Sequence, residues 1–156
     1  MDFQTRILDL FNASIDTKTY ASEVLPPFIE VASQMMVQCL VSEGKILACG
    51  NGGSAADSEH IVGKLMKGFI LERKLTASQK KPYQRLFQEE RAMITDNLQQ
   101  AFPAISLVNA ISLSTAFAND IEPDFVFAQQ IFGIGRRGDV LLAISTSGNS
   151  KNIESE

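Results

Sequence analysis

Hydrophobic positions in the first part of the chain recur with the spacing of an α-helix. Over residues 3–19 the apolar side chains fall three or four positions apart, which places them along one side of a helix. A second helix is predicted over residues 26–42, because Pro26 and Pro27 suit its first turn and Gly44 stops it. The chain is therefore expected to open with two N-terminal helices.

The pattern then changes to short continuous apolar runs, which are typical of buried strands. Such runs predict strands at residues 45–49, 102–108 and 139–144. The stretches between them predict helices at residues 54–67, 110–118 and 122–134. Strands that alternate with helices favour a parallel sheet with helices on both faces, a three-layer αβα sandwich of the flavodoxin or Rossmann-like kind. Ligands of such sheets lie beyond the carboxyl ends of the strands.

Residues 70–100 interrupt this alternation with a polar and charged stretch. They contain Pro82, mix basic with acidic side chains and carry no strong apolar stripe. We expect a solvated surface excursion from a single domain that spans residues 1–156. A partner-binding element, or a lid over the site, is the alternative interpretation.

Composition and charge narrow the class of protein. Hydrophobic residues make up 45% of the chain and charged residues 21%, and the net charge of -4 argues against a nucleic-acid-binding surface. No apolar run reaches the roughly 18 residues of a membrane-spanning helix, and the opening MDFQTRILDLF lacks the pattern of a signal peptide. Cys39 and Cys49 sit in apolar contexts and are expected to be free thiols. We expect a cytoplasmic protein with no membrane partner and no direct contact with nucleic acid.

Two loops of small polar residues follow the first and third predicted strands. Loop one holds Asn51, Gly52, Gly53 and Ser54, and loop two (residues 145–150) holds Ser145, Thr146, Ser147 and Ser150. Glycine lets a ligand approach the main chain, hydroxyl groups donate hydrogen bonds, and a following helix turns its positive end to the same point. Either loop alone could be a plain strand-to-helix turn with a serine cap. Two such loops at one edge of a sheet predict a phosphate-binding site.

A dinucleotide site is an alternative for loop one. Residues 50–55 also fit the G-x-G-x-x-A fingerprint, and Glu72 lies about 20 residues further on, where a ribose-binding acid would sit. This interpretation predicts an NAD-type dinucleotide binder, but it leaves loop two without a role.

The stretches GNGGSAADSEH and GDVLLAISTSGNS together resemble the sugar isomerase (SIS) domain family, and within it the sedoheptulose-7-phosphate isomerases, also called phosphoheptose isomerases. The stretch from Pro103 to Leu107 and the pair Asn119–Asp120 match the same group. The resemblance implies a homotetramer with sites at subunit interfaces and a sugar phosphate such as sedoheptulose 7-phosphate as ligand. It places the phosphate on loop two, with loop one beside it and Asn119 and Asp120 near the sugar.

The resemblance also implies aldose–ketose isomerisation, in which a base removes a proton next to the carbonyl and an acid returns it to the neighbouring carbon. His60 stands where the family has its first histidine, and several members bind zinc there. Four residues on, this chain has Lys64 where the family has a glutamate base, and a charged lysine offers no acceptor. Lys64 could act as a base only in a buried setting, and Asp57 is the candidate substitute on the same helix face. His60, Lys64 and Asp57 are thus the candidate catalytic residues, and His60 is the candidate zinc ligand.

The family continues with further strands and a long helix that supplies a second histidine, and we expect this C-terminal part of the domain to be absent here. Two non-catalytic alternatives therefore stay open. One is an SIS adaptor similar to the homologue that associates with the bacterial replication initiator. The other is a regulator that binds a sugar phosphate without converting it.

Overall fold

The computed structural model describes residues 2–154 and divides the chain into two compact units, with the boundary between Gln38 and Cys39. The first unit contains helix α1 (Phe3–Val24) and most of helix α2 (Pro26–Val41). Both predicted N-terminal helices are present, and α1 continues to Val24 because no helix-breaking residue stops it at residue 19. Among the described residues, no single helix is long and apolar enough to cross a membrane, and only α1 and α2 taken together, with a bend of 66° between them, have the necessary length and composition.

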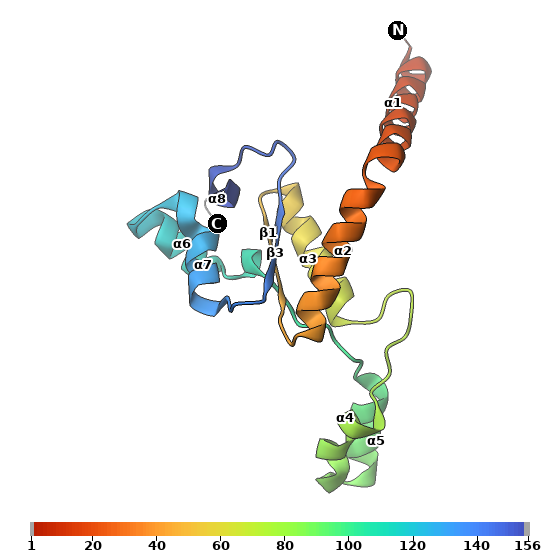
Figure 1. Ribbon diagram of the computed structural model, residues 1–156, viewed down its shortest axis with the longest axis vertical. Helices are drawn as coiled ribbons and strands as arrows, with labels where there is room; N and C mark the ends of the chain where they lie inside the picture. Colours follow the sequence, from red (N-terminus) through yellow and green to blue (C-terminus); the bar gives the residue numbers. More distant parts are fainter. Residues whose placement is uncertain (1, 155–156) are drawn as a thin grey trace. The chain divides into compact units, whose positions relative to one another are not determined.

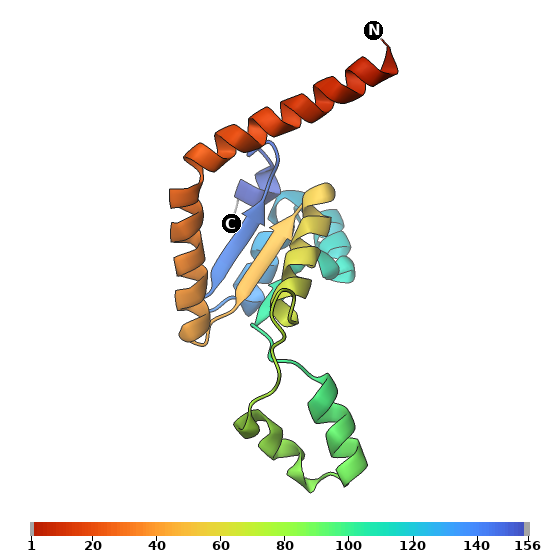
Figure 2. The ribbon, with the colours of Figure 1, turned by 90° about the vertical axis from the view of Figure 1, so that its right-hand side faces the viewer.

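Three parallel strands form the sheet of the second unit, and Figure 2 shows them side by side. They are β1 (Ile46–Gly50), β2 (Ala104–Ser106) and β3 (Val140–Ile144), in the order β2-β1-β3. The central strand β1 is buried along its whole length, and its first four residues are at most 2% exposed. A central parallel strand is covered on both faces, which explains why its sequence is continuously apolar.

Helices cover the two faces of this sheet. In Figure 1, α3 (Gly53–Met66) lies on one side of β1 and β3, and α6 (Ile111–Asp120) and α7 (Val126–Ile134) lie on the other. The main core cluster joins the α7 side of the sheet to the helices, and its buried members are Leu47, Cys49, Leu107, Val126 and Phe127. The predicted three-layer αβα architecture is confirmed, and Cys39 and Cys49 are buried and form no disulfide within the described residues.

The predicted strand at residues 102–108 is shorter in the structure. Only residues 104–106 pair with β1, and the chain then turns into the 3-10 helix η2 (Leu107–Asn109). Pro103 precedes the paired residues because it has no N–H to give to a ladder. The helix predicted from residue 122 likewise begins with a 3-10 turn, η3 (Pro123–Phe125), before α7. After β3 and loop two, one further helical turn, α8 (Lys151–Glu154), completes the described chain.

The polar stretch between α3 and β2 folds into short helical pieces. These are α4 (Ala77–Lys80), η1 (Lys81–Arg85) and α5 (Gln88–Asn97), which Figure 1 shows below the sheet. The two ends of the stretch are held together: Lys74 and Gln99 form an antiparallel bridge, and the Gln100 N–H donates to the Arg73 carbonyl at 2.7 Å. Most of its side chains are exposed.

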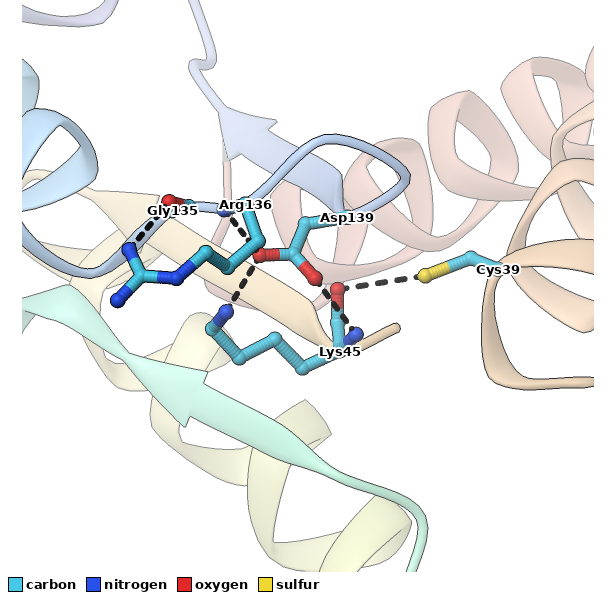
Figure 3. Close-up of polar contacts among 5 residues, drawn as sticks. All are labelled: Cys39, Lys45, Gly135, Arg136 and Asp139. Carbon is cyan, nitrogen blue, oxygen red and sulfur yellow. Dashed lines mark hydrogen bonds and ion pairs between the residues drawn. The ribbon is translucent and has the colours of Figure 1, made fainter. Parts of the chain in front are cut away.

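An ion pair joins β1 and β3 at their amino ends, opposite the loops (Figure 3). Lys45 Nζ lies 2.5 Å from Asp139 Oδ2, and the backbone N–H groups of Lys45 and Arg136 donate to the same carboxylate at 2.9 and 2.7 Å. The Asp139 side chain is only 8% exposed. Burial alone would raise the pKa of Asp139, but the hydrogen bonds from Lys45 and Arg136 outweigh it and hold that pKa below 3.8. This pair therefore fixes the start of two neighbouring strands.

Candidate functional site

Loop one and loop two start from neighbouring positions of the sheet. The last residues of β1 and β3, Gly50 and Ile144, are paired directly across the parallel ladder. Parallel strands carry their carboxyl ends to the same edge, so the two loops that follow must emerge side by side. The predicted meeting of the two loops is therefore present.

Two glycines shape the turn from β1 into α3, for different reasons. A Cβ on Gly50 would lie 2.6 Å from the Ser54 carbonyl oxygen, because the first turn of α3 folds back against the strand end. Gly52 has φ 55°, in the left-handed region that favours glycine. By contrast, a Cβ on Gly53 would meet no atom within 4 Å, so this position faces open space.

A pair of side-chain amides connects loop one to the far side of loop two. Asn51 Nδ2 donates to Asn152 Oδ1 at 2.8 Å, and Asn152 Nδ2 donates to Asn51 Oδ1 at 3.0 Å. Ser54, the other predicted polar residue of loop one, is 5% exposed and so is buried beneath the loop.

The serines of loop two hold the loop in shape. The Gly148 N–H donates to Ser145 Oγ at 3.0 Å, and the hydroxyl oxygens of Ser145 and Ser150 are 3.3 Å apart. Ser147 Oγ accepts from the N–H of Asn149 at 3.2 Å, while Ser147 and Thr146 remain exposed. The loop thus gathers four hydroxyl groups within a single turn of chain.

His60 lies further along α3, about 10 Å from Gly53 on the helix axis at 1.5 Å per residue. It borders a mostly apolar groove of about 460 Å³ that also takes in Lys64, Phe69, Arg73 and Phe102. An imidazole can both accept and return a proton near neutral pH. His60 therefore has the chemistry for proton transfer at a distance from the two loops.

The Lys64 side chain is turned toward an aromatic ring. Its Nζ lies 3.5 Å from the centroid of the Phe69 ring, a cation–π contact. Beneath it, Arg73 Nη2 donates to the carbonyls of Lys64 and Leu65 at 3.2 and 2.7 Å and so closes the end of α3. The half-buried Lys64 thus lines the groove as a cation.

The residues around His60 do not fit a zinc site. Asp57 is exposed, and no ion pair within 4.0 Å joins it to His60 in residues 2–154. Across that same described range, no three His, Cys, Asp or Glu side chains are grouped so that they could hold a metal ion. A structural or catalytic zinc needs three or four such ligands.

Asn119 and Asp120 lie at the C-terminal end of α6. Asn119 Nδ2 donates to Asp120 Oδ1 at 2.8 Å, and no hydrogen bond joins either side chain to loop one or loop two in the part of the chain that the structure describes. The structure thus brings the two loops together, but it shows no contact between them and this pair.

The geometry of a dinucleotide site is not formed. The stretch from Gly68 to Leu71 is no strand, and Glu72 lies in irregular backbone, where its side chain is 66% exposed and 3.5 Å from Lys74 Nζ. A ribose-binding acid belongs at the end of the strand that follows the glycine-rich turn. Here the strand that follows α3 along the chain is β2, at residues 104–106.

Three residues of this region were not singled out by the sequence. Phe69 and Arg73 line the groove of His60, and Asn152 partners Asn51. The position of Asn152 directly after loop two was a usable signal. Nothing in the spacing of 101 residues indicated its partner.

Comparison with known proteins places this α/β ligand-binding architecture in a family. A family model described as the SIS domain matches residues 11–80. The phosphoheptose isomerase of Chromohalobacter salexigens is 54% identical over 153 residues, which cover 98% of this chain and 64% of that protein. The phosphoheptose isomerase of Shewanella denitrificans is 45% identical over 148 residues, which cover 95% of this chain and 62% of that protein.

Solved structures of phosphoheptose isomerases have a similar fold. The phosphoheptose isomerase of Francisella tularensis superposes with a TM-score of 0.78 at 32% identity and covers 99% of this chain and 68% of its own. The enzyme GmhA of Neisseria gonorrhoeae gives a TM-score of 0.74 at 35% identity, with coverages of 98% and 66%. The chain belongs to the SIS domain family, and the relatives named above are phosphoheptose isomerases. It spans somewhat less than two thirds of the length of the two curated relatives named above.

Proposed function

We propose that this chain binds a sugar phosphate and takes part in aldose–ketose isomerisation of sedoheptulose 7-phosphate. The observation that carries the proposal is the pairing of Gly50 with Ile144, which sets loop one beside loop two at one edge of the sheet. Backbone N–H groups and serine hydroxyls gathered at such an edge suit a phosphate. The phosphoheptose isomerases to which the chain is similar share the fold around these loops.

The position of His60 indicates which end of the substrate would lie beside it. In a heptose 7-phosphate the reacting carbons lie at the opposite end of the sugar from the phosphate. With the phosphate on the loops, these carbons would extend along α3 toward His60, about 10 Å away along the helix. His60 would then hold and return the proton that moves between neighbouring carbons.

A second candidate function is binding without conversion, as in a sensor or an adaptor. The observation in its favour is Lys64, which is a cation packed on Phe69 and offers no acceptor for the substrate proton. Asp57 stays exposed and has no ion pair with His60 in the described range. One experiment separates the two functions.

Calorimetry with sedoheptulose 7-phosphate, combined with NMR of the same sample, tests the proposal. We expect saturable binding by the chain and the appearance of aldose signals. Replacing Ser147 and Ser150 together with alanine should weaken binding about a hundredfold, because two lost hydrogen bonds to a charged group, at about 1.5 kcal/mol each, cost about 3 kcal/mol. Thermal unfolding of the variant serves as the folding control.

The outcomes of this experiment are distinct. Binding without aldose signals would support the sensor or adaptor and reject catalysis by this chain. Unchanged affinity in the double serine variant would reject the placement of the phosphate on loop two. No binding by the unmodified chain would reject the sugar phosphate as its ligand.

We also propose that the chain forms a homo-oligomer, a tetramer, in the cytoplasm. Helix α1 buries none of its residues and presents a stripe of exposed apolar side chains, which includes Phe3, Ile7, Leu10, Phe11 and Ile15. Exposed apolar surface of this extent is typical of an interface.

Sedimentation of charged variants tests the assembly. Replacing Phe11 and Ile15 with aspartate should shift the protein from oligomer to monomer, because two charges would have to be buried in the interface. Asp9→Lys reverses a charge on the polar side of the same helix, away from Phe11 and Ile15, and should leave the oligomer intact. Equal sedimentation of both variants as oligomers would reject α1 as an interface.

A further inference from the structure

The reciprocal amide pair of Asn51 and Asn152 ties two distant parts of the chain together at the site. The two hydrogen bonds are 2.8 and 3.0 Å long and join residues 101 positions apart. An amide carries two N–H donors and one carbonyl oxygen. The pair engages one N–H and the oxygen of each side chain, which fixes the orientation of both amides and leaves one N–H of each for water or a ligand.

Asn152 is in turn held by the core of the domain. Its neighbour Ile153 packs against the main core cluster, and the Ile153 N–H donates to the Ser150 carbonyl at 2.8 Å. The position of Asn152 is thus set by buried apolar contacts and by the end of loop two. The backbone of Asn51 follows Gly50, the buried end of β1, but its side chain is exposed and its amide is hydrogen-bonded to Asn152.

Asn51 is also hydrogen-bonded to the first turn of α3. Its carbonyl oxygen accepts from the Ser54 N–H at 3.0 Å, in the first turn of the helix. A rotation of Asn51 would therefore disturb both its amide and the glycines that follow it. The hydrogen bonds from Asn152 resist that rotation.

We propose that Asn152 is a positioning residue of the sugar-phosphate site, which holds loop one in register with loop two so that both face the same phosphate. The inference rests on the proposed function. In this arrangement Asn152 fixes the orientation of the Asn51 side chain, and Asn51 in turn holds loop one in place.

A double-mutant cycle with calorimetry tests the inference. The four proteins are the unmodified chain, Asn152→Ala, Asn51→Ala and the double variant, each titrated with sedoheptulose 7-phosphate. Each single variant should weaken binding about tenfold, the size of one to two lost hydrogen bonds. The double variant should lose no more than either single variant, because the two side chains act through one pair.

Two further measurements separate positioning from a merely structural role. Asn152→Gln keeps the amide and should recover part of the lost affinity, whereas a role in folding alone would not require that group. Thermal unfolding of all variants should stay close to that of the unmodified chain, since an exposed hydrogen-bonded pair adds little to stability.

The results discriminate between this inference and the function on which it rests. If the unmodified chain binds and Asn152→Ala binds equally well, the positioning role is wrong and the proposed function stands. If the losses of binding free energy in the two single variants add up in the double variant, Asn152 contacts the ligand independently of Asn51. The proposed positioning through Asn51 is then wrong. If the unmodified chain does not bind, the proposed function is wrong and the positioning role has no ligand to serve.

Discussion

Gly50→Ala is expected to destabilise the fold by about 3 kcal/mol, the upper range for a methyl group forced into a packed site. The added Cβ would lie 2.6 Å from the Ser54 carbonyl oxygen and 2.7 Å from the carbonyl carbon. Both are backbone atoms of the first turn of α3, so neither can move aside without displacing the helix from the end of β1. Urea unfolding of the variant measures the loss.

Gly53→Ala is the matched control for this prediction, three residues further along the same turn. Its Cβ meets nothing within 4 Å, and alanine suits a helix better than glycine does. We expect stability within about 1 kcal/mol of the unmodified chain. Similar losses in the two variants would show that the turn tolerates no side chain anywhere and would contradict the argument from close approach at Gly50.

The same control variant reports on ligand binding. If a phosphate lies against loop one, the methyl group of Gly53→Ala occupies space that the ligand needs. Affinity for sedoheptulose 7-phosphate should then fall while the unfolding midpoint stays the same. Unchanged affinity would place the ligand away from Gly53.

Asp139→Asn is expected to cost about 3 kcal/mol at neutral pH, because it leaves the half-buried Lys45 ammonium without its partner. The carboxylate also accepts the backbone N–H groups of Lys45 and Arg136, and a carboxamide oxygen can replace only part of these contacts. Denaturant unfolding of both proteins at several pH values measures the difference.

The pH dependence of this difference follows from the lowered pKa of Asp139 in the folded protein. A carboxyl group whose folded pKa lies below 3.8 contributes its stabilisation fully above that value and loses it as the pH falls through the folded pKa. The gap between the unmodified chain and Asp139→Asn should therefore be constant near neutrality and shrink below about pH 4. A gap that stays constant into strong acid would contradict the ion pair as its cause.

Two controls sharpen this prediction. Glu72→Gln removes an exposed pair with Lys74 and should change stability by no more than about 0.5 kcal/mol. Lys45→Met combined with Asp139→Asn should cost less than the sum of the two single changes, because neither variant side chain leaves a buried charge unpaired.

The layers of the fold were predictable from the chain because each element carries its own periodic signal. The run at residues 45–49 is apolar at every position, which only a strand covered on both faces requires, and β1 is such a strand. The strand predicted at residues 102–108 was longer than the one that forms. Pro103 and the 3-10 turn after Ser106 restrict pairing to three residues, and apolar content alone does not reveal a turn.

The candidate site was predictable only in part. Loop one and loop two were located correctly because both follow strands of one parallel sheet, whose carboxyl ends must share an edge. The surroundings of His60 were not, because Phe69 and Arg73 reach the groove from the irregular segment after α3, where no period fixes the direction of a side chain.

By itself, the sequence determined the three-layer class and the meeting of loop one and loop two, because these follow from local periodicity and from the geometry of parallel strands. The family followed from the resemblance of its motifs to the SIS domain. Tertiary structure alone decided that Lys64 packs on Phe69, that Asn152 is hydrogen-bonded to Asn51 and that Asp139 forms an ion pair with Lys45. Each of these contacts joins side chains whose directions depend on how separate elements pack, and no spacing along the chain encodes that.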